Sequence, residues 1–244
     1  MARRWEAQAE RWLRWARTPD FDAYWYYRDA FFDRLVPAPS GRTLEVGCGE
    51  GRVARDLRAR GHTVVGVDSS PALVGHAVDA DPEGAYVVAD AASLPFPGAS
   101  FDLVVAYNSL MDVDDLDGTL AEAVRVMTAG GRLCVCVTHP IGDAGHFEDS
   151  DPMAPFVIDG AYLGRRRRSE AHVEQDGLEM SFSGWAAPLE AYGRAFEAAG
   201  LLIEALREPV PAERAGGRHA RWRRVPLFVH LRCRRVPGKG KLTA

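Results

Sequence analysis

The spacing of hydrophobic and polar positions changes along the chain, and these changes predict its elements. Over the first 36 residues, aromatic and charged positions recur at helical spacing, which predicts two short helices broken at Thr18-Pro19-Asp20. A proline-rich linker, 37–41, follows. Apolar runs then alternate with amphipathic stretches, which predicts strands at 43–47, 63–68, 85–89, 101–107 and 131–138 and helices at 51–60, 71–80 and 115–127. This alternation favours a parallel sheet covered by helices.

Residues 139–187 interrupt this rhythm with His, Pro, Gly, Asp and a basic run. The rhythm resumes with a helix at 188–199, a strand at 201–208 and a last strand from about 225 to 235. We interpret the interruption as an insertion that forms a mobile lid over a substrate. Its apolar side chains would contact a ligand, and the arginines at 165–168 would be solvent-exposed or face an anionic group of the substrate.

A glycine turn follows the first predicted strand, within Leu44–Arg52. Glycines at 47, 49 and 51 permit a sharp turn and close approach of the backbone to a ligand, and the helix that follows presents unpaired N–H groups. Asp68 ends the second strand about 20 residues later, where a carboxylate can accept both hydroxyls of a ribose. A dinucleotide fingerprint would need a third glycine where Arg52 stands, so the pattern indicates another nucleotide-type cofactor.

Four segments, in this order, resemble motifs of the class I S-adenosylmethionine (SAM) dependent methyltransferases of small-molecule type. Glu45-x-Gly-x-Gly-x-Gly51 resembles the first motif, Val88–Phe96 the adenine-binding segment, and Ser100–Ala106 the fourth-strand motif. Met127–Leu133 resembles the later glycine turn, although Ala129 replaces its proline. The resemblance implies a Rossmann-like, doubly wound α/β fold whose mostly parallel sheet has an antiparallel last strand.

The resemblance also implies a division of the chain and a set of cofactor contacts. We expect an N-terminal helical cap (1–40), a SAM-binding core (41–138), the substrate lid (139–187), and the rest of the core with a basic tail (188–244). Asp68 would bind the ribose, the Asp90 carboxylate would accept the adenine amino group, and the Ala91 N–H would reach a ring nitrogen. The residues expected to bind SAM, or its product S-adenosylhomocysteine (SAH), are Glu45, Gly47, Cys48, Gly49, Gly51, Asp68, Ser69, Asp90, Ala91, Tyr107, Tyr27 and Arg28.

The last two of these residues belong to the aromatic segment 24–28, which could close over the cofactor with Arg28 near a carboxylate. A packed amphipathic helix explains the same aromatics equally well.

Little catalytic chemistry is required, because the sulfonium of SAM already makes the methyl carbon electrophilic. His139 follows the fifth strand directly and could act as a general base, or it could be a loop residue. Asn108, the only Asn in the chain, could line the methyl-transfer site or cap a turn. Asp102 could act in catalysis, or it could have a structural capping role behind the sheet.

Composition limits the remaining possibilities. The 244 residues, 47% of them apolar, suffice for one domain, and the scarcity of Lys and Asn suggests a GC-rich bacterial genome. A charged start and the lack of an 18-residue apolar run predict a cytoplasmic protein without membrane attachment. The four cysteines are expected to be buried thiols, and we expect no metal site.

Charge is unevenly distributed. The net charge is −4, yet ten Lys and Arg lie between Arg214 and Lys241 with no acidic residue after Glu213. This block could attract an acidic substrate or nucleic acid, or it could be a solvated edge strand and tail.

We therefore expect methyl transfer to a small molecule, which could be acidic, at oxygen rather than at nitrogen or carbon. RNA methylation is the alternative among enzymes, although no RNA-binding module is recognisable. A SAM-binding protein that transfers no methyl group is the alternative among other classes. A homodimer is left open.

Overall fold

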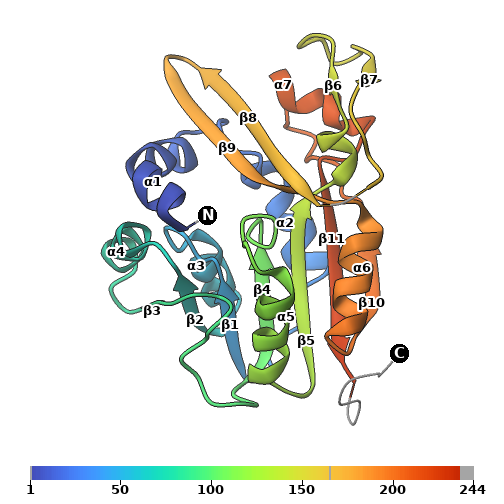
Figure 1. The fold of residues 1–244 in the computed structure, drawn as a ribbon. Helices are drawn as coiled ribbons and strands as arrows, with labels where there is room; N and C mark the ends of the chain where they lie inside the picture. The colour runs from blue at the N-terminus through green and yellow to red at the C-terminus, as the bar shows by residue number, and fades with distance from the viewer. Residues whose placement is uncertain (1, 165, 237–244) are drawn as a thin grey trace.

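The computed structural model describes residues 2–164 and 166–236, so Arg165, Lys239 and Lys241 of the basic runs lie outside the described residues. A seven-stranded sheet forms the centre of the molecule, in the order β10-β11-β5-β4-β1-β2-β3 (Figure 1). The strands are β1 (Arg42–Val46), β2 (Thr63–Asp68), β3 (Ala85–Val88), β4 (Phe101–Tyr107), β5 (Met127–Thr138), β10 (Leu201–Arg207) and β11 (Phe228–Arg235). Strands β1 to β5 are parallel, and β11 is antiparallel to both of its neighbours. The expected fold class is thereby confirmed.

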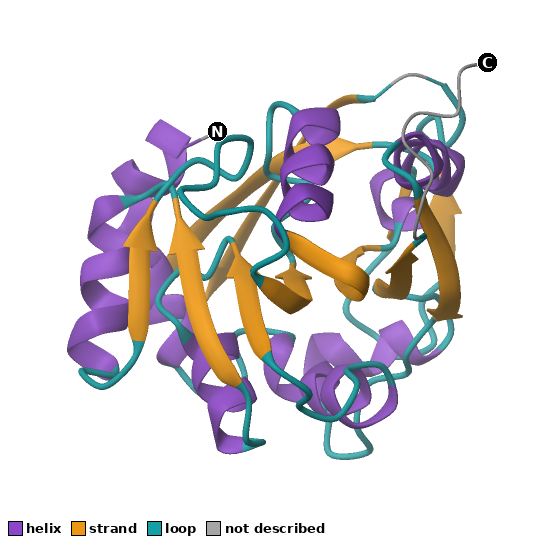
Figure 2. Cartoon of the chain, turned by 90° about the horizontal axis from the view of Figure 1, so that it is seen from below, coloured by secondary structure: helices purple, strands orange, loops and turns teal. Residues whose placement is uncertain are grey.

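Helices cover both sides of this sheet (Figure 2). They are α3 (Arg52–Ala59), α4 (Pro71–Ala80), α5 (Leu116–Val126) and α6 (Leu189–Ala198), each within two residues of the predicted bounds. The largest difference is in β5, which begins four residues earlier than predicted because Met127 already pairs with Phe101 of β4. The register shifts just after this pair, and Gly130 has φ +80°. Local periodicity does not reveal such a bulge.

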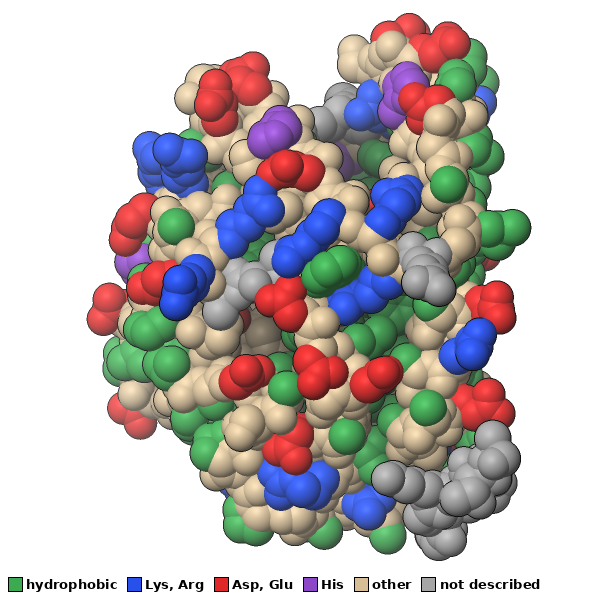
Figure 3. Space-filling model, in the orientation of Figure 1, with side chains coloured by type: hydrophobic (Ala, Val, Ile, Leu, Met, Phe, Trp, Pro, Cys, Tyr) green, Lys and Arg blue, Asp and Glu red, His purple; other side chains and the backbone are tan. Residues whose placement is uncertain are grey.

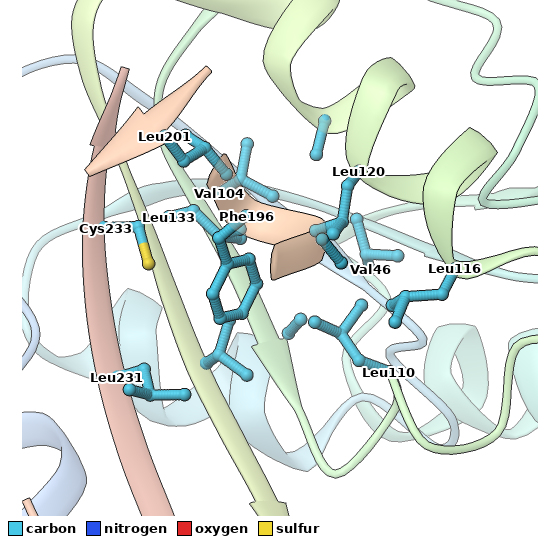
Figure 4. Packing of buried hydrophobic residues seen from close by; sticks show 14 of the residues in the cluster. Val46, Val104, Leu110, Leu116, Leu120, Leu133, Phe196, Leu201, Leu231 and Cys233 are labelled. Carbon is cyan, nitrogen blue, oxygen red and sulfur yellow. The ribbon is translucent and has the colours of Figure 1, made fainter. Parts of the chain in front are cut away.

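The strands bury both faces, as their continuous apolar runs predict. In β4, Leu103 and Val105 pack with α2 (Tyr24–Arg34) and α3, whereas Val104 and Ala106 pack with α5 and α6. Figure 4 shows the second cluster, with Leu120 and Phe196 pointing toward the strands from their helices. Burial of each such Leu, Val or Phe side chain stabilises the fold by about 1.5–3 kcal/mol. This packing holds the strands, and therefore the edge of the sheet at which they end, in a fixed position.

Two helices precede the sheet, and the predicted break at Thr18-Pro19-Asp20 is confirmed. α1 (Ala2–Arg17) packs against α4 and against β9 (Leu178–Ala186), whereas α2 packs on the sheet. Between them, Asp20 has φ +65°, and Asp22 Oδ1 accepts a 2.7 Å hydrogen bond from the Tyr24 N–H. We refer to residues 2–34 as the N-terminal cap.

The segment after β5 contains a short helical turn, η1 (Pro140–Asp143), and two hairpins. One pairs β6 (Gly145–Phe147) with β7 (Phe156–Ile158), and the other pairs β8 (Arg167–Gln175) with β9. The β8–β9 hairpin crosses the upper end of the sheet and reaches α1 (Figure 1), where Phe182 lies edge-to-face with Trp15 at 5.9 Å. Two further turns, α7 (Gly217–Ala220) and η2 (Arg221–Arg223), precede β11. No helix among the described residues is long and apolar enough to cross a membrane.

Candidate cofactor and acceptor site

The glycine turn lies between β1 and α3, where the strand order reverses between β1 and β4. Gly47 has φ +75°, and a Cβ there would lie 2.4 Å from the Cβ of Ser109, because the loops after β1 and β4 cross at this point. The N–H groups of Gly47 and Cys48 donate to the Val67 carbonyl at 2.8 and 2.9 Å. The turn is therefore anchored to β2 at the switch point of the sheet, where folds of this type bind ligands.

Asp68, at the end of β2, is held from both sides. Its Oδ2 accepts from the Gly49 N–H and its Oδ1 from the Ser70 N–H, each at 2.9 Å. Burial raises the pKa of this carboxyl, and the backbone donors act in the opposite direction. The carboxylate is therefore oriented by the turn itself, and its remaining lone pairs can accept ribose hydroxyls.

A cavity of about 600 Å³ joins this turn to an apolar chamber. Ten of the residues predicted from the sequence line it, namely Glu45, Gly47, Cys48, Gly49, Asp68, Ser69, Asp90, Ala91, Tyr107 and Asn108. The chamber is lined mainly by aromatic side chains of the cap, the β8–β9 hairpin and the C-terminal segment, among them Trp15, Phe21, Phe182, Trp222 and Phe228. Figure 3 shows a hollow below the hairpin with acidic side chains on its lower rim. One cavity thus contacts both the predicted cofactor residues and a second apolar surface.

Three of the predicted contacts are not part of the cavity wall. Gly51 does not line it but supports the turn, with φ +81° directly before α3. Tyr27 is fully buried against Phe228, with ring centroids 4.9 Å apart. The Arg28 guanidinium pairs with Asp56 on α3 at 3.0 Å. The face of α2 that carries these two side chains packs on the sheet and on α3, so neither closes over the cavity as expected.

His139 also lies outside the cavity wall, contrary to expectation. Its side chain is buried, its Nδ1 accepts from the Ile141 N–H at 3.2 Å, and its Nε2 lies 3.1 Å from Glu208 Oε1. Burial lowers the pKa of this imidazole. Both ring nitrogens are thus directed at other groups, because the chain turns into η1 immediately after the strand.

The same turn instead brings Asp143 to the cavity. Its Oδ1 accepts from the Ser169 hydroxyl of β8 at 2.7 Å, and burial raises the pKa of the carboxyl. Sequence reasoning selected the residue next to the strand and missed the carboxylate that the helical turn directs inward.

Asn108 and Asp102 are placed differently, although both are on or next to β4. Asn108 lines the cavity with φ +51°, a conformation that Asn tolerates better than most residues, and its N–H donates to the Cys136 carbonyl at 2.8 Å. Asp102 accepts from the Arg42 N–H and the Thr128 hydroxyl at 3.2 and 3.1 Å, away from the cavity. Of its two possible roles, the structure supports the structural one.

Asp112 is a cavity residue that sequence reasoning missed. Burial raises the pKa of this carboxyl to about 8, and the Trp5 indole N–H donates to Oδ2 at 3.1 Å. It belongs to the Asn108–Asp112 segment after β4, which the sequence did single out. However, only the packing of α1 shows that this carboxyl is partly buried beside Trp5.

The environment of Glu45 indicates whether the cavity suits a cofactor with a cationic group. The side chain is 1% exposed, and its Oε2 has no hydrogen-bond partner among the described residues. Burial and the nearby Asp68 and Glu50 raise its pKa well above the ordinary value. A buried acceptor without a donor is costly, so a ligand ammonium beside the glycine turn would complete the site. A nucleoside that carries an amino acid fits this donor set.

The fold and the cavity together define an α/β protein that binds a nucleoside-type cofactor at its switch point. A family model described as a methyltransferase domain matches residues 44–135. An aklanonic acid methyltransferase of a Streptomyces species is 30% identical over 180 residues, which are 69% of this chain and 78% of that protein. The chain belongs to the class I family of SAM-dependent methyltransferases. The cofactor of this family is SAM.

Other similarities are less complete or show only the fold. A demethylmenaquinone methyltransferase of Beutenbergia cavernae is 37% identical over 138 residues, which are 56% of this chain and 53% of that protein. The chain thus spans about half the length of such curated relatives. A solved SAM-dependent methyltransferase from Mesorhizobium loti has a TM-score of 0.69 at 24% identity, covering 88% of this chain and 99% of that one.

Proposed function

We propose that this protein transfers a methyl group from SAM to a small, largely apolar acceptor, at oxygen rather than at nitrogen or carbon. The observation that carries this proposal is one continuous cavity, because it joins the glycine turn and Asp68 to an aromatic chamber under the β8–β9 hairpin. An apolar methyl acceptor needs such a surface beside the cofactor. The names of the relatives support a small-molecule acceptor, and the neutral character and the oxygen position are our inference from the cavity.

The cofactor contacts follow from the placement of the acidic side chains. Asp68 binds the ribose hydroxyls, the exposed Asp90 carboxylate accepts the adenine amino group, and the Ala91 N–H donates to the ring. Glu45 accepts from the α-ammonium, which supplies the missing donor for Oε2. These contacts would hold the cofactor with its sulfonium near the ends of β1 and β4.

SAM supplies an electrophilic methyl group, so the protein mainly orients the acceptor and excludes water. Tyr107 and Asn108 form the wall at the end of β4, and Phe182 covers the cavity from the hairpin. If the nucleophile is a hydroxyl, Asp143 takes its proton in place of His139, because Asp143 is the carboxylate that the segment after β5 brings to the cavity.

The lining of the cavity favours a neutral aromatic acceptor over an acidic one. Carboxylates outnumber guanidiniums in its wall, and aromatic side chains dominate the chamber. RNA is also disfavoured, because much of the described basic C-terminal block contacts the protein itself. Arg223 donates to the backbone carbonyls of residues 212, 213 and 215, and Arg224 donates to that of residue 154. Arg232 and Arg234 pair with Glu204. Few cations remain for a phosphate backbone.

Methyl transfer can be tested with isotopically labelled SAM and a panel of phenols, hydroquinones, aromatic amines, aromatic carboxylic acids and a short RNA. We expect label in a phenol or hydroquinone. The Asp90→Asn variant should require a higher SAM concentration for the same rate, which would show that the transfer depends on the proposed cofactor site. Label only in amines, acids or RNA would contradict the acceptor assignment. Tight SAH binding without transfer to any member would favour a protein that binds SAM for another purpose.

A further inference from the structure

Arg52 lies where the cofactor half of the cavity meets the N-terminal cap. It is the first residue of α3, directly after the glycine turn, and its side chain lines the cavity. The guanidinium lies over two rings of the cap, 4.9 Å from the Trp12 centroid and 4.3 Å from that of Tyr24. Its Nη2 donates to Asp22 Oδ2 at 3.2 Å. The position of this charged group is therefore fixed by packing and by an ion pair.

The other terminal nitrogen has no partner. Nη1 is buried and has no hydrogen-bond acceptor among the described residues. Three carboxylates lie near this guanidinium. Asp22 already pairs with Nη2, and Glu50 pairs with Arg17 and Arg55 at 3.2 and 2.8 Å. Glu45 is close enough for Arg52 to lower its pKa, but its Oε2 accepts no hydrogen bond from the described residues. A desolvated guanidinium N–H without an acceptor is unfavourable, so an anionic group of a ligand would complete this site.

We propose that Arg52 binds the α-carboxylate of SAM through Nη1 while Nη2 keeps its bond to Asp22. This inference rests on the proposed use of SAM in the cavity. Glu45 supplies the complementary charge, since its unpartnered Oε2 lies in the same cavity wall. An unpartnered acid and an unpartnered guanidinium match the two charges of an α-amino acid, and the N-terminus of α3 adds a partial positive charge beside the carboxylate.

One guanidinium would then connect cofactor binding to the cap. Trp12 is on α1, Asp22 lies in the linker between α1 and α2, and Tyr24 is the first residue of α2. All three groups that hold Arg52 therefore belong to the N-terminal cap. A carboxylate bound to Nη1 would fix the guanidinium against these partners. A cofactor with an amino-acid end should therefore protect the backbone amides of α1 from hydrogen exchange more than a nucleoside without one.

The test compares two ligands, SAH and 5′-methylthioadenosine, which lacks the amino-acid end. Calorimetry should show that Arg52→Met weakens SAH binding roughly ten- to hundredfold, the range for a hydrogen bond to a charged group, and changes methylthioadenosine binding by less than about twofold. Arg52→Lys should give an intermediate loss for SAH, because an ammonium keeps the charge but lacks the planar fork. Arg28→Met is the matched control: this guanidinium also lies over a tryptophan but is outside the cavity wall, and both affinities should stay unchanged.

Three results would overturn the assignment. Equal losses for both ligands in the Arg52 variants would mean that Arg52 only supports the cap. Unchanged SAH affinity in both Arg52 variants would remove the residue from the carboxylate site. Failure of the unmodified protein to bind either ligand would instead overturn the proposed function, and this inference with it. Hydrogen exchange gives an independent measure, since equal protection of α1 by the two ligands would refute the connection to the cap.

Discussion

Replacing Glu45 by Gln should stabilise the free protein and weaken its cofactor binding at the same time. The carboxyl is 1% exposed, and its Oε2 has no hydrogen-bond partner among the described residues. Burial, together with Asp68 and Glu50, raises its pKa well above 4.5. Gln keeps the shape of the side chain, removes the charge and adds an N–H₂ group that can donate to either neighbouring carboxylate.

The sign of the pH dependence follows from the direction of this shift. Because the folded protein holds the proton more tightly than the unfolded chain, stability is lost as pH rises from the unfolded pKa toward the raised folded pKa. Gln removes this loss. Relief of a buried unsatisfied group is worth about 1–3 kcal/mol, and for a chain of this size each kcal/mol raises Tm by roughly 2–4 °C. The gain should be small near pH 5 and largest above neutrality.

Thermal unfolding of the free protein between pH 5 and 8.5, with SAH calorimetry at pH 8, measures both effects. We expect Tm to rise by about 2 °C or more at pH 8, and SAH affinity to fall roughly ten- to hundredfold, because the α-ammonium loses an anionic acceptor. Glu190→Gln is the control, since that side chain is 74% exposed on α6. A lower Tm at pH 8, or unchanged SAH binding, would refute the reasoning.

Four other substitutions test separate parts of the site. Asp68→Ala should weaken SAH binding by about 1.5–3 kcal/mol in calorimetry, and an unchanged affinity would exclude a ribose contact. Asp90→Asn should weaken SAM binding without changing the circular dichroism spectrum, whereas unfolding would show a structural role. His139→Ala should leave SAH affinity and the pH profile of transfer within about twofold, and a loss above tenfold would restore it as a base. Asp112→Asn should raise Tm at pH 8 but not at pH 4, because a folded pKa of about 8 means that the protein loses stability as pH rises between these values. Equal changes of Tm at both pH values would contradict the raised pKa of this carboxyl.

The strands and helices of the central sheet and the cofactor turn could be predicted from the residues alone, whereas the hairpins of the 139–187 segment could not. Strand and helix periodicity and the backbone freedom of glycine are local properties, so the α/β alternation and the turn at Gly47–Gly51 could be predicted within a few residues. The positions of Asp68 and Asp90 followed in the same way, because a residue at the carboxyl end of a parallel strand lies at the ligand-binding edge wherever the rest of the chain packs.

Which side chains face the cavity depends on how distant segments pack together. Tyr27, Arg28 and His139 have suitable chemistry but point into the sheet, toward α3 or toward Glu208. Arg52 became a candidate because Trp12 of α1 and Tyr24 of α2 lie over its guanidinium, and Asp112 because Trp5 of α1 donates a hydrogen bond to it. The direction of a side chain and the loss of its water depend on segments far away in sequence, and these long-range contacts leave no periodic signal in the residues themselves.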